Sequence, residues 1–260
     1  MNREAIVLPA VAPVHKEPVF SSEMISQALM WENVTIQETY KNWYQIRMED
    51  GYPGWIHSFY LNCNNPRHEE HIFVTDRYAP VFYEIDKQNS IAALLSYGTY
   101  VPVVNIESGY CKIYLPDGST GFIKLQKQIN KKSREIIIEL AISLLAVPYL
   151  WGGKSSFGYD CSGFVQMILK TADIHIKRDT GLQIKTTELD KIHLDEARPG
   201  DLIFFLENNR TNHVAFLIGE GKIIHCSGQV KIESIIKGET GFSAQLNKHE
   251  KIAMSIDRLI

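Results

Sequence analysis

The hydrophobic pattern changes near residue 130 and divides the chain into two parts. Up to residue 128, short apolar and aromatic runs alternate with Pro, Gly, Asp and Asn, which is typical of short strands and turns. Beyond it, helical apolar spacing occupies 133–146 and stops before Pro148, and a second helix is predicted over 160–172. Apolar runs at 202–206, 213–218 and 222–227 predict strands. The first part is therefore expected to be all-β and the second α+β.

An internal repeat lies within the β-rich part. A shift of 67 residues places Asp50-Gly51 on Asp117-Gly118 and Gly54-Trp55-Ile56 on Gly121-Phe122-Ile123 without a gap. The Asp-Gly pairs suit tight hairpins, because Gly adopts positive φ easily. Two copies of about 60 residues predict two small β-barrels.

Composition narrows the class of protein. The 260 residues are 45% apolar and 22% charged, with a net charge of −3, as in ordinary folded proteins. This balance gives no electrostatic reason to expect a nucleic-acid partner, and no apolar run is long enough to cross a membrane. The early apolar run is broken by Pro9 and Pro13, which makes a poor signal peptide. We therefore expect a cytoplasmic protein, or a periplasmic or secreted one if a leader has been removed.

Candidate chemistry centres on Cys161 and two histidines. Cys161 is predicted at the start of a helix, where unpaired N–H groups and the helix dipole favour a thiolate. His213 and His225 lie on two strands joined by a turn at 219–221, so their side chains are predicted to meet. Structural roles for these residues stay open at this point, as does a metal site built from all three, although no zinc signature is present.

Five segments in order resemble the NlpC family of papain-like cell-wall peptidases. They are Pro148–Gly153, Tyr159–Gln166, Pro199–Phe205, His213–Ala215 and Ile223–His225. The resemblance implies Cys161 as nucleophile, His213 as base and His225 as the residue that orients His213. It also implies that Tyr149 and the backbone N–H of Cys161 form the oxyanion hole.

The N-terminal half extends the resemblance. Tandem bacterial SH3-like (SH3b) domains before such a catalytic domain resemble the γ-D-glutamyl-L-diamino acid endopeptidases, or dipeptidyl-peptidases VI. This implies two all-β SH3-like barrels, at 1–65 and 66–130, followed by an α+β papain-like domain at 131–260. It also implies cysteine-peptidase cleavage of the γ-D-Glu–diamino acid bond in peptidoglycan stem peptides that begin with a free L-Ala, within cell-wall recycling. The implied substrate-binding residues are Glu23, Tyr52, Trp151, Asp160, Ser162, Asp179 and Thr180.

Physical reasoning supports such a pocket, because a free ammonium group needs carboxylates around it. Glu23, Asp160 and Asp179 could supply them and would exclude a blocked N-terminus. We expect no cofactor, metal, nucleic acid or membrane to be involved. Two alternatives stay open: an inactive SH3b protein that binds peptidoglycan, and a papain-like amidase or acyltransferase. The third stem residue, meso-diaminopimelate or L-Lys, is not determined, and residues 230–260 are expected only to close the sheet.

Overall fold

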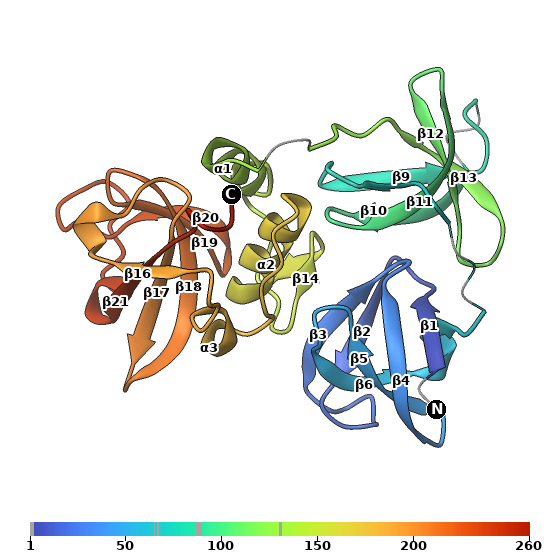
Figure 1. The fold of residues 1–260 in the computed structure, drawn as a ribbon, viewed down its shortest axis with the longest axis horizontal. Coiled ribbons are helices and arrows are strands. Elements are labelled where there is room, and N and C mark those ends of the chain that lie inside the picture. Colours follow the sequence, from blue (N-terminus) through green and yellow to red (C-terminus); the bar gives the residue numbers. More distant parts are fainter. Residues whose placement is uncertain (1–2, 65, 67, 87–89, 130–131) are drawn as a thin grey trace. The chain divides into compact units, whose positions relative to one another are not determined.

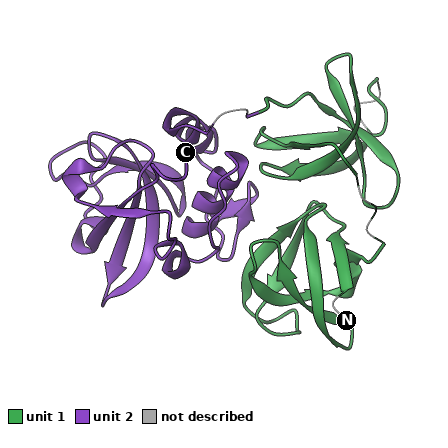
Figure 2. Cartoon of the chain, viewed as in Figure 1, with its two compact units in different colours: residues 1–128 green, residues 129–260 purple. Residues whose placement is uncertain are grey.

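The computed structural model describes residues 3–64, 66, 68–86, 90–129 and 132–260 (Figure 1). The chain forms two compact units, residues 1–128 and 129–260 (Figure 2). The boundaries predicted after residues 65 and 130 fall on residues outside the described part of the chain.

In its described residues, the first unit consists of β-strands and one short 3₁₀ helix. Its first sheet has the order β3-β2-β6-β5-β4-β1-β7. The strands are β1 (Arg3–Val7), β2 (Val11–His15), β3 (Met24–Leu29), β4 (Asn33–Tyr40), β5 (Trp43–Met48), β6 (Pro53–His57) and β7 (Leu61–Asn62), with a 3₁₀ helix at Ser58–Tyr60 before β7. The second sheet has the order β10-β9-β13-β12-β11-β8. Its strands are β8 (His71–Phe73), β9 (Tyr78–Phe82), β10 (Ile91–Ser96), β11 (Tyr100–Glu107), β12 (Tyr110–Tyr114) and β13 (Thr120–Lys124).

The sequence repeat is also a structural repeat. Strands β9 to β13 follow the order of β2 to β6, and each begins 67 residues after its counterpart. The repeated glycines Gly54 and Gly121 are required for the same steric reason in both sheets. A Cβ at Gly54 would lie 2.3 Å from a methyl carbon of Val14, and one at Gly121 would lie 2.4 Å from the matching methyl of Val81. Each sheet therefore closes over a valine at a point where only glycine fits.

One side chain ties the two sheets of this unit together. Trp31 follows β3 and is buried in a cluster that includes Val81 and Ile113 of the second sheet. Its indole Nε1–H donates to the Tyr114 carbonyl at 3.0 Å. Because the indole buries both its ring and its one polar group here, the two sheets share part of a core.

The second unit is a six-stranded antiparallel sheet with helices packed against it. The sheet order is β16-β21-β17-β18-β19-β20. Its strands are β16 (Asp190–Ile192), β17 (Leu202–Glu207), β18 (Arg210–Gly219), β19 (Lys222–Ser227), β20 (Gln229–Ser234) and β21 (Glu250–Ser255). A small hairpin contains β14 (Lys154–Ser155) and β15 (Gly158–Tyr159). The helices are α1 (Arg134–Ser143), α2 (Cys161–Thr171) and α3 (Thr180–Gln183), with 3₁₀ turns at Leu194–Glu196 and Leu246–Lys248.

Helix α2 is the buried centre of this unit. It packs against α1 and against strands β18 and β19 (Figure 1). Phe164 meets Phe216 of β18 edge to face, with ring centroids 6.1 Å apart. The helix exposes almost none of its side chains, so the sheet and α1 fix its position, and with it the position of its first residue, Cys161.

The predicted elements are present with small shifts. The helices expected over 133–146 and 160–172 are α1 and α2, and the expected strands are β17, β18 and β19. Residues 230–260 add β20 at one edge, but β21 inserts between β16 and β17 instead of extending the other edge. No helix in the described ranges has the length and apolar character needed to span a membrane.

A close backbone contact at Gly163 predicts an effect on stability. A Cβ there would lie 2.1 Å from the Gly153 carbonyl oxygen, so Gly163→Ala should lower the free energy of unfolding by about 1–3 kcal/mol, despite the better helix propensity of Ala. The matched control is Gly181→Ala in α3, where a Cβ meets nothing within 4 Å, and it should be neutral or slightly stabilising. Urea denaturation checks both. Equal stability of the two variants would contradict the contact.

Candidate active site

The site is built around the first residue of α2. Asp160 is the N-cap, and its Oδ1 accepts a hydrogen bond from the Gly163 backbone N–H at 2.7 Å. Cys161 follows as the first helical residue and keeps partial exposure to solvent. The backbone N–H groups of Val214 and Ser162 favour negative charge on its sulfur. Because α2 packs against β18 and Val214 follows His213 on that strand, the thiol lies near the part of β18 that carries His213.

A fully buried arginine holds this helix start in place. Arg178 donates to Asp160 Oδ1 at 2.9 Å and to Oδ2 at 2.5 Å. It also bonds to Ser162 Oγ at 2.8 Å and to the Gly153 carbonyl at 3.3 Å. A buried guanidinium needs such partners, and its planar fork matches a carboxylate. The Asp160 charge is therefore paired inside the protein.

The ionisation of Cys161 differs from the expectation based on its helix position. Burial and the Asp160 carboxylate raise the pKa of the Cys161 thiol to about 11, and the N–H groups of Val214 and Ser162 oppose this only in part. The direction of this pKa shift is opposite to the one expected from the helix position alone. Desolvation and the neighbouring carboxylate outweigh the helix terminus, because both penalise negative charge on the sulfur.

A chain of polar side chains crosses three neighbouring strands. His213 of β18 bonds through Nε2 to His225 Nδ1 of β19 at 2.7 Å, which confirms that the two side chains meet. His225 bonds in turn through Nε2 to Glu233 Oε2 of β20 at 2.9 Å. Glu233 Oε1 lies 3.2 Å from Lys231 Nζ. His225 is completely buried, so this chain fixes its orientation.

The hydrogen bonds between these side chains also determine which ring nitrogens carry protons. Burial lowers the pKa of His213 to about 3 and that of His225 to about 4, so both rings are neutral at pH 7. Burial opposes ionisation of Glu233, but Lys231 and His225 outweigh it and lower its pKa. An ionised carboxylate only accepts hydrogen bonds. Therefore His225 carries its proton on Nε2, His213 carries its proton on Nε2, and His213 Nδ1 holds the lone pair of a base.

Tyr149 lies in the same environment as Cys161. Its backbone N–H donates to the Gly228 carbonyl at 2.8 Å, which attaches it to the turn between β19 and β20. Burial, followed by Cys161 and Asp160, raises the pKa of its phenol to about 12. The hydroxyl therefore keeps its proton and can donate a hydrogen bond near the sulfur.

Other predicted binding residues of the second unit lie on the segments that flank this centre. Ser162 Oγ bonds to Asp160 Oδ1 at 3.2 Å, and Thr180 Oγ1 donates to the Thr211 carbonyl of β18 at 3.1 Å. Asp179 is the N-cap residue of α3. Trp151 is 62% exposed, so its indole is accessible to a ligand.

Two predicted binding residues, Glu23 and Tyr52, belong to the first unit. Glu23 forms an ion pair with Lys16 at 3.4 Å. Tyr52 is partly buried against the core of the first sheet, and its backbone N–H donates to Asp50 Oδ1 at 2.9 Å. Their part in a shared pocket stays a prediction.

Two residues of this site, Arg178 and Glu233, were not among those predicted from the sequence. Arg178 stands next to the predicted Asp179 and could have been suspected there as a partner for Asp160. Glu233 carries no signal of its own, because only the pairing of β20 with β19 places it near His225. Within the described ranges, no group of three or more His, Cys, Asp or Glu side chains is arranged to hold a metal ion.

Comparison with known proteins shows which family has this sequence and fold. Residues 146–246 match the NlpC/P60 family, and residues 14–59 match the bacterial dipeptidyl-peptidase Sh3 domain. A γ-D-glutamyl-L-lysine dipeptidyl-peptidase from Bacillus subtilis is 31% identical over 237 residues, which cover 85% of this chain and 78% of that protein. The chain belongs to the NlpC/P60 family. It is therefore a cysteine peptidase of that family with an SH3-like domain in its N-terminal half.

Further relatives agree with this assignment. A dipeptidyl-peptidase 6 from Lysinibacillus sphaericus is 26% identical, over 89% of this chain and 91% of that protein. The crystal structure of an NlpC/P60 family protein from Bacillus cereus superposes with a TM-score of 0.81 at 22% identity, and covers 96% of this chain and 98% of that one. The fold of this NlpC/P60 protein is thus shared over nearly its whole length.

The Arg178–Asp160 pair predicts a second effect on stability. Arg178→Met leaves the Asp160 carboxylate without its buried partner and should lower the free energy of unfolding by about 3–5 kcal/mol. The matched control is Arg258→Met, because Arg258 pairs with Asp190 at 3.3 Å on the surface, where such pairs contribute about 1 kcal/mol or less. Urea denaturation monitored by tryptophan fluorescence measures both losses. Similar losses in the two variants would contradict a special role for the buried pair.

Proposed function

We propose that this protein is a cysteine endopeptidase that hydrolyses the γ-D-Glu–diamino acid bond of peptidoglycan stem peptides with a free N-terminal L-Ala. It releases L-Ala-γ-D-Glu, and its role is in cell-wall recycling. The observation that carries the proposal is the arrangement of Cys161 at the start of α2 next to β18, whose His213 is bonded to His225. The name of the Bacillus subtilis relative supports cleavage of a γ-D-glutamyl bond, and the name of the Lysinibacillus relative supports a dipeptidyl-peptidase.

The proposed reaction uses the proton positions of the free site. Cys161 Sγ gives its proton to His213 Nδ1 as the sulfur attacks the γ-carbonyl carbon of D-Glu. The backbone N–H of Cys161 and the Tyr149 hydroxyl hold the oxyanion. His213 then protonates the departing amine, and a thioester remains. Water gives a proton to His213 and attacks the thioester, and the proton returns to the sulfur as L-Ala-γ-D-Glu leaves.

His225 and Glu233 support this reaction by stabilising His213 when it carries a second proton. The imidazolium formed during attack keeps its Nε2–H bond to His225, and His225 keeps its bond to the Glu233 carboxylate. The negative charge of Glu233 favours the positive charge two hydrogen bonds away. In this reaction Glu233 is a positioning residue, because it acts on the reacting atoms only through the two histidines.

The substrate's free amine gives the N-terminal half a role. We assign Glu23, Tyr52, Asp160 and Asp179 to the site of the L-Ala ammonium, with Trp151, Ser162 and Thr180 completing the pocket. The shared sheet order and the 67-residue shift support a second SH3-like domain after the first, with domains at 1–65, 66–130 and 131–260. Asp160 is already paired with Arg178 in the buried corner of the site, and Glu23 with Lys16 on the surface.

Hydrolysis of L-Ala-γ-D-Glu-meso-diaminopimelate, beside its N-acetylated form, tests the proposed function. The protein should release L-Ala-γ-D-Glu from the free peptide only, and Cys161→Ala should abolish release. Cys63→Ala removes an exposed cysteine and should leave the rate unchanged. Equal cleavage of the acetylated peptide would remove the amine-binding roles. No cleavage by folded protein would refute the peptidase proposal and favour a binding protein or an acyltransferase.

A pH profile tests the role of Glu233. Because the carboxylate raises the pKa of His225, Glu233→Gln should move the acidic limb of kcat/KM to lower pH by about one unit. The same change should lower kcat about tenfold, since the imidazolium loses a stabilising charge. The matched control, Glu239→Gln, removes a carboxylate that bonds to Ser234 Oγ at 2.8 Å and should do neither. A loss of rate that is the same at every pH, without a shift of the acidic limb, would mean that Glu233 has only a structural role.

A further inference from the structure

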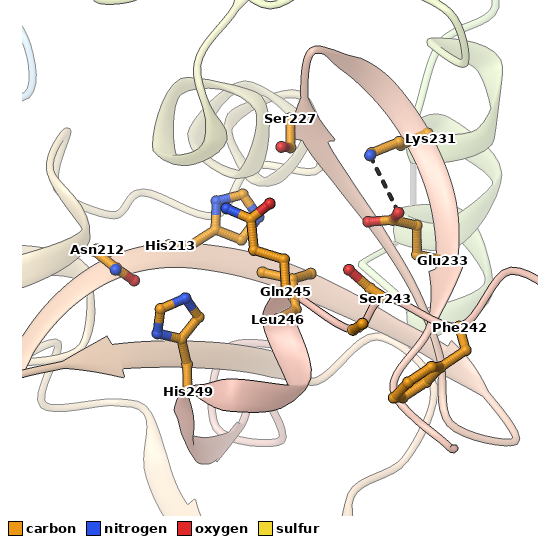
Figure 3. A pocket seen from close by; sticks show the side chains of 11 residues that line it. Asn212, His213, Ser227, Lys231, Glu233, Phe242, Ser243, Gln245, Leu246 and His249 are labelled. Atoms are coloured by element: carbon orange, nitrogen blue, oxygen red, sulfur yellow. Dashed lines mark ion pairs between the residues drawn. The ribbon is translucent and has the colours of Figure 1, made fainter. Parts of the chain in front are cut away.

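A pocket of about 400 Å³ opens beside His213 within the second unit (Figure 3). Its wall comes from β18, β19, β20 and the segment 242–249, which the sequence analysis expected only to close the sheet. Its volume falls in the range of small-molecule sites. The eleven residues that line it include none of those predicted to bind the L-Ala-γ-D-Glu part of the substrate.

The position of His213 identifies the side of the substrate that this pocket faces. A general acid must reach the departing nitrogen within hydrogen-bond distance, so the residue that carries this nitrogen lies against His213 during the reaction. The acyl part of the substrate is bonded to Cys161 instead and extends toward the residues around α2. A pocket lined by His213 but not by Cys161 is therefore on the side of the leaving amino acid.

The charges in the pocket wall are of both signs and adjacent. Lys231 and Glu233 stand two residues apart on β20, with Nζ and Oε1 at 3.2 Å, and both face the pocket (Figure 3). Their side chains are 34% and 22% exposed, so a ligand can reach them. An ammonium has three N–H groups and a carboxylate oxygen has two lone pairs. The Lys231 ammonium and the Glu233 carboxylate can therefore bond to each other and to a ligand at the same time.

Such a pair complements a group that itself carries both charges. The far end of meso-diaminopimelate bears an ammonium and a carboxylate on one carbon, whereas the far end of L-Lys bears an ammonium alone. The L-Lys ammonium can pair with Glu233 but brings no carboxylate of its own for Lys231, so it gains one ion pair where meso-diaminopimelate gains two and it lies beside a like charge. His249 adds a further group that can donate to a carboxylate, and Ser243 and Gln245 are neutral hydrogen-bonding groups on the same wall.

We propose that this pocket binds the side chain of the leaving diamino acid, and that Lys231 and Glu233 select a residue whose far end carries both an amine and a carboxylate. The inference rests on the proposed function. It assigns Lys231 as a specificity-determining residue, and it gives Glu233 a second contact besides His225.

The test compares three substrates that share L-Ala-γ-D-Glu and differ in the leaving group: meso-diaminopimelate, L-Lys and p-nitroaniline. The protein should show a kcat/KM at least about tenfold higher for the meso-diaminopimelate peptide than for the L-Lys peptide. Lys231→Gln should bring this ratio to within about twofold of one, mainly through KM. Lys231 also forms an ion pair with Glu233, so its replacement can disturb the two histidines. Such a disturbance lowers kcat/KM for all three substrates alike. The ratio of kcat/KM between the meso-diaminopimelate and L-Lys peptides therefore reports on the pocket alone.

Lys237→Gln is the matched control, because Lys237 is exposed near the end of β20 and does not line the pocket. It should keep the ratio of the unaltered protein. Equal kcat/KM for the two peptides, or a preference that Lys231→Gln does not reduce, would overturn the inference while cleavage itself upholds the proposed function. No hydrolysis of any of the three substrates, the anilide included, would instead overturn the proposed function and the inference with it.

Discussion

The bonds of buried Arg178 to Asp160, Ser162 and Gly153 are the constraint on which the catalytic unit depends. They join the loop before α2, the N-cap of α2 and its first turn into one rigid corner. Gly163 is required at the same corner, because the Gly153 carbonyl leaves no room for a side chain. A nucleophile held by such contacts keeps its place without relying on a mobile loop, which suits a reaction that is sensitive to small displacements.

This corner also explains why the thiol is neutral in the free site. Burial is the larger cause of the raised pKa of the Cys161 thiol, and the carboxylate that caps α2 adds to it. The neighbouring histidines are neutral for the same reason, since burial disfavours the imidazolium. Before substrate binds, Cys161 and His213 therefore do not form an ion pair with each other. Charge develops during attack, where the polar chain from His213 to Glu233 is oriented to stabilise it.

The sheet has two functions that meet on β20. One end of the polar chain, Glu233, fixes the proton of His225, and its other oxygen forms the wall of a pocket with Lys231. The same strand also fixes the segment before Tyr149. The Val230 N–H donates to the Val147 carbonyl, and the Val230 carbonyl accepts from the Ala146 N–H. Base orientation, the position of the phenol and recognition of the leaving group thus share one edge strand.

Local patterns in the sequence determined the element types, the 67-residue repeat and the identity of Cys161, His213 and His225 as candidates. Helical spacing, Asp-Gly turns and a short hairpin are local, so they can be recognised without knowing the fold. The resemblance to a known family added roles for residues that the patterns leave neutral, such as Tyr149.

Tertiary structure alone decided the partners of these residues. Arg178 reaches Asp160 from 18 positions away, and Glu233 meets His225 only because β20 pairs with β19 in one register. The pKa of Cys161 also depends on burial and on a neighbouring carboxylate, which oppose the effect predicted from its helix position. These features arise from packing between segments distant in sequence, and no local pattern of residue types encodes which distant side chains will meet.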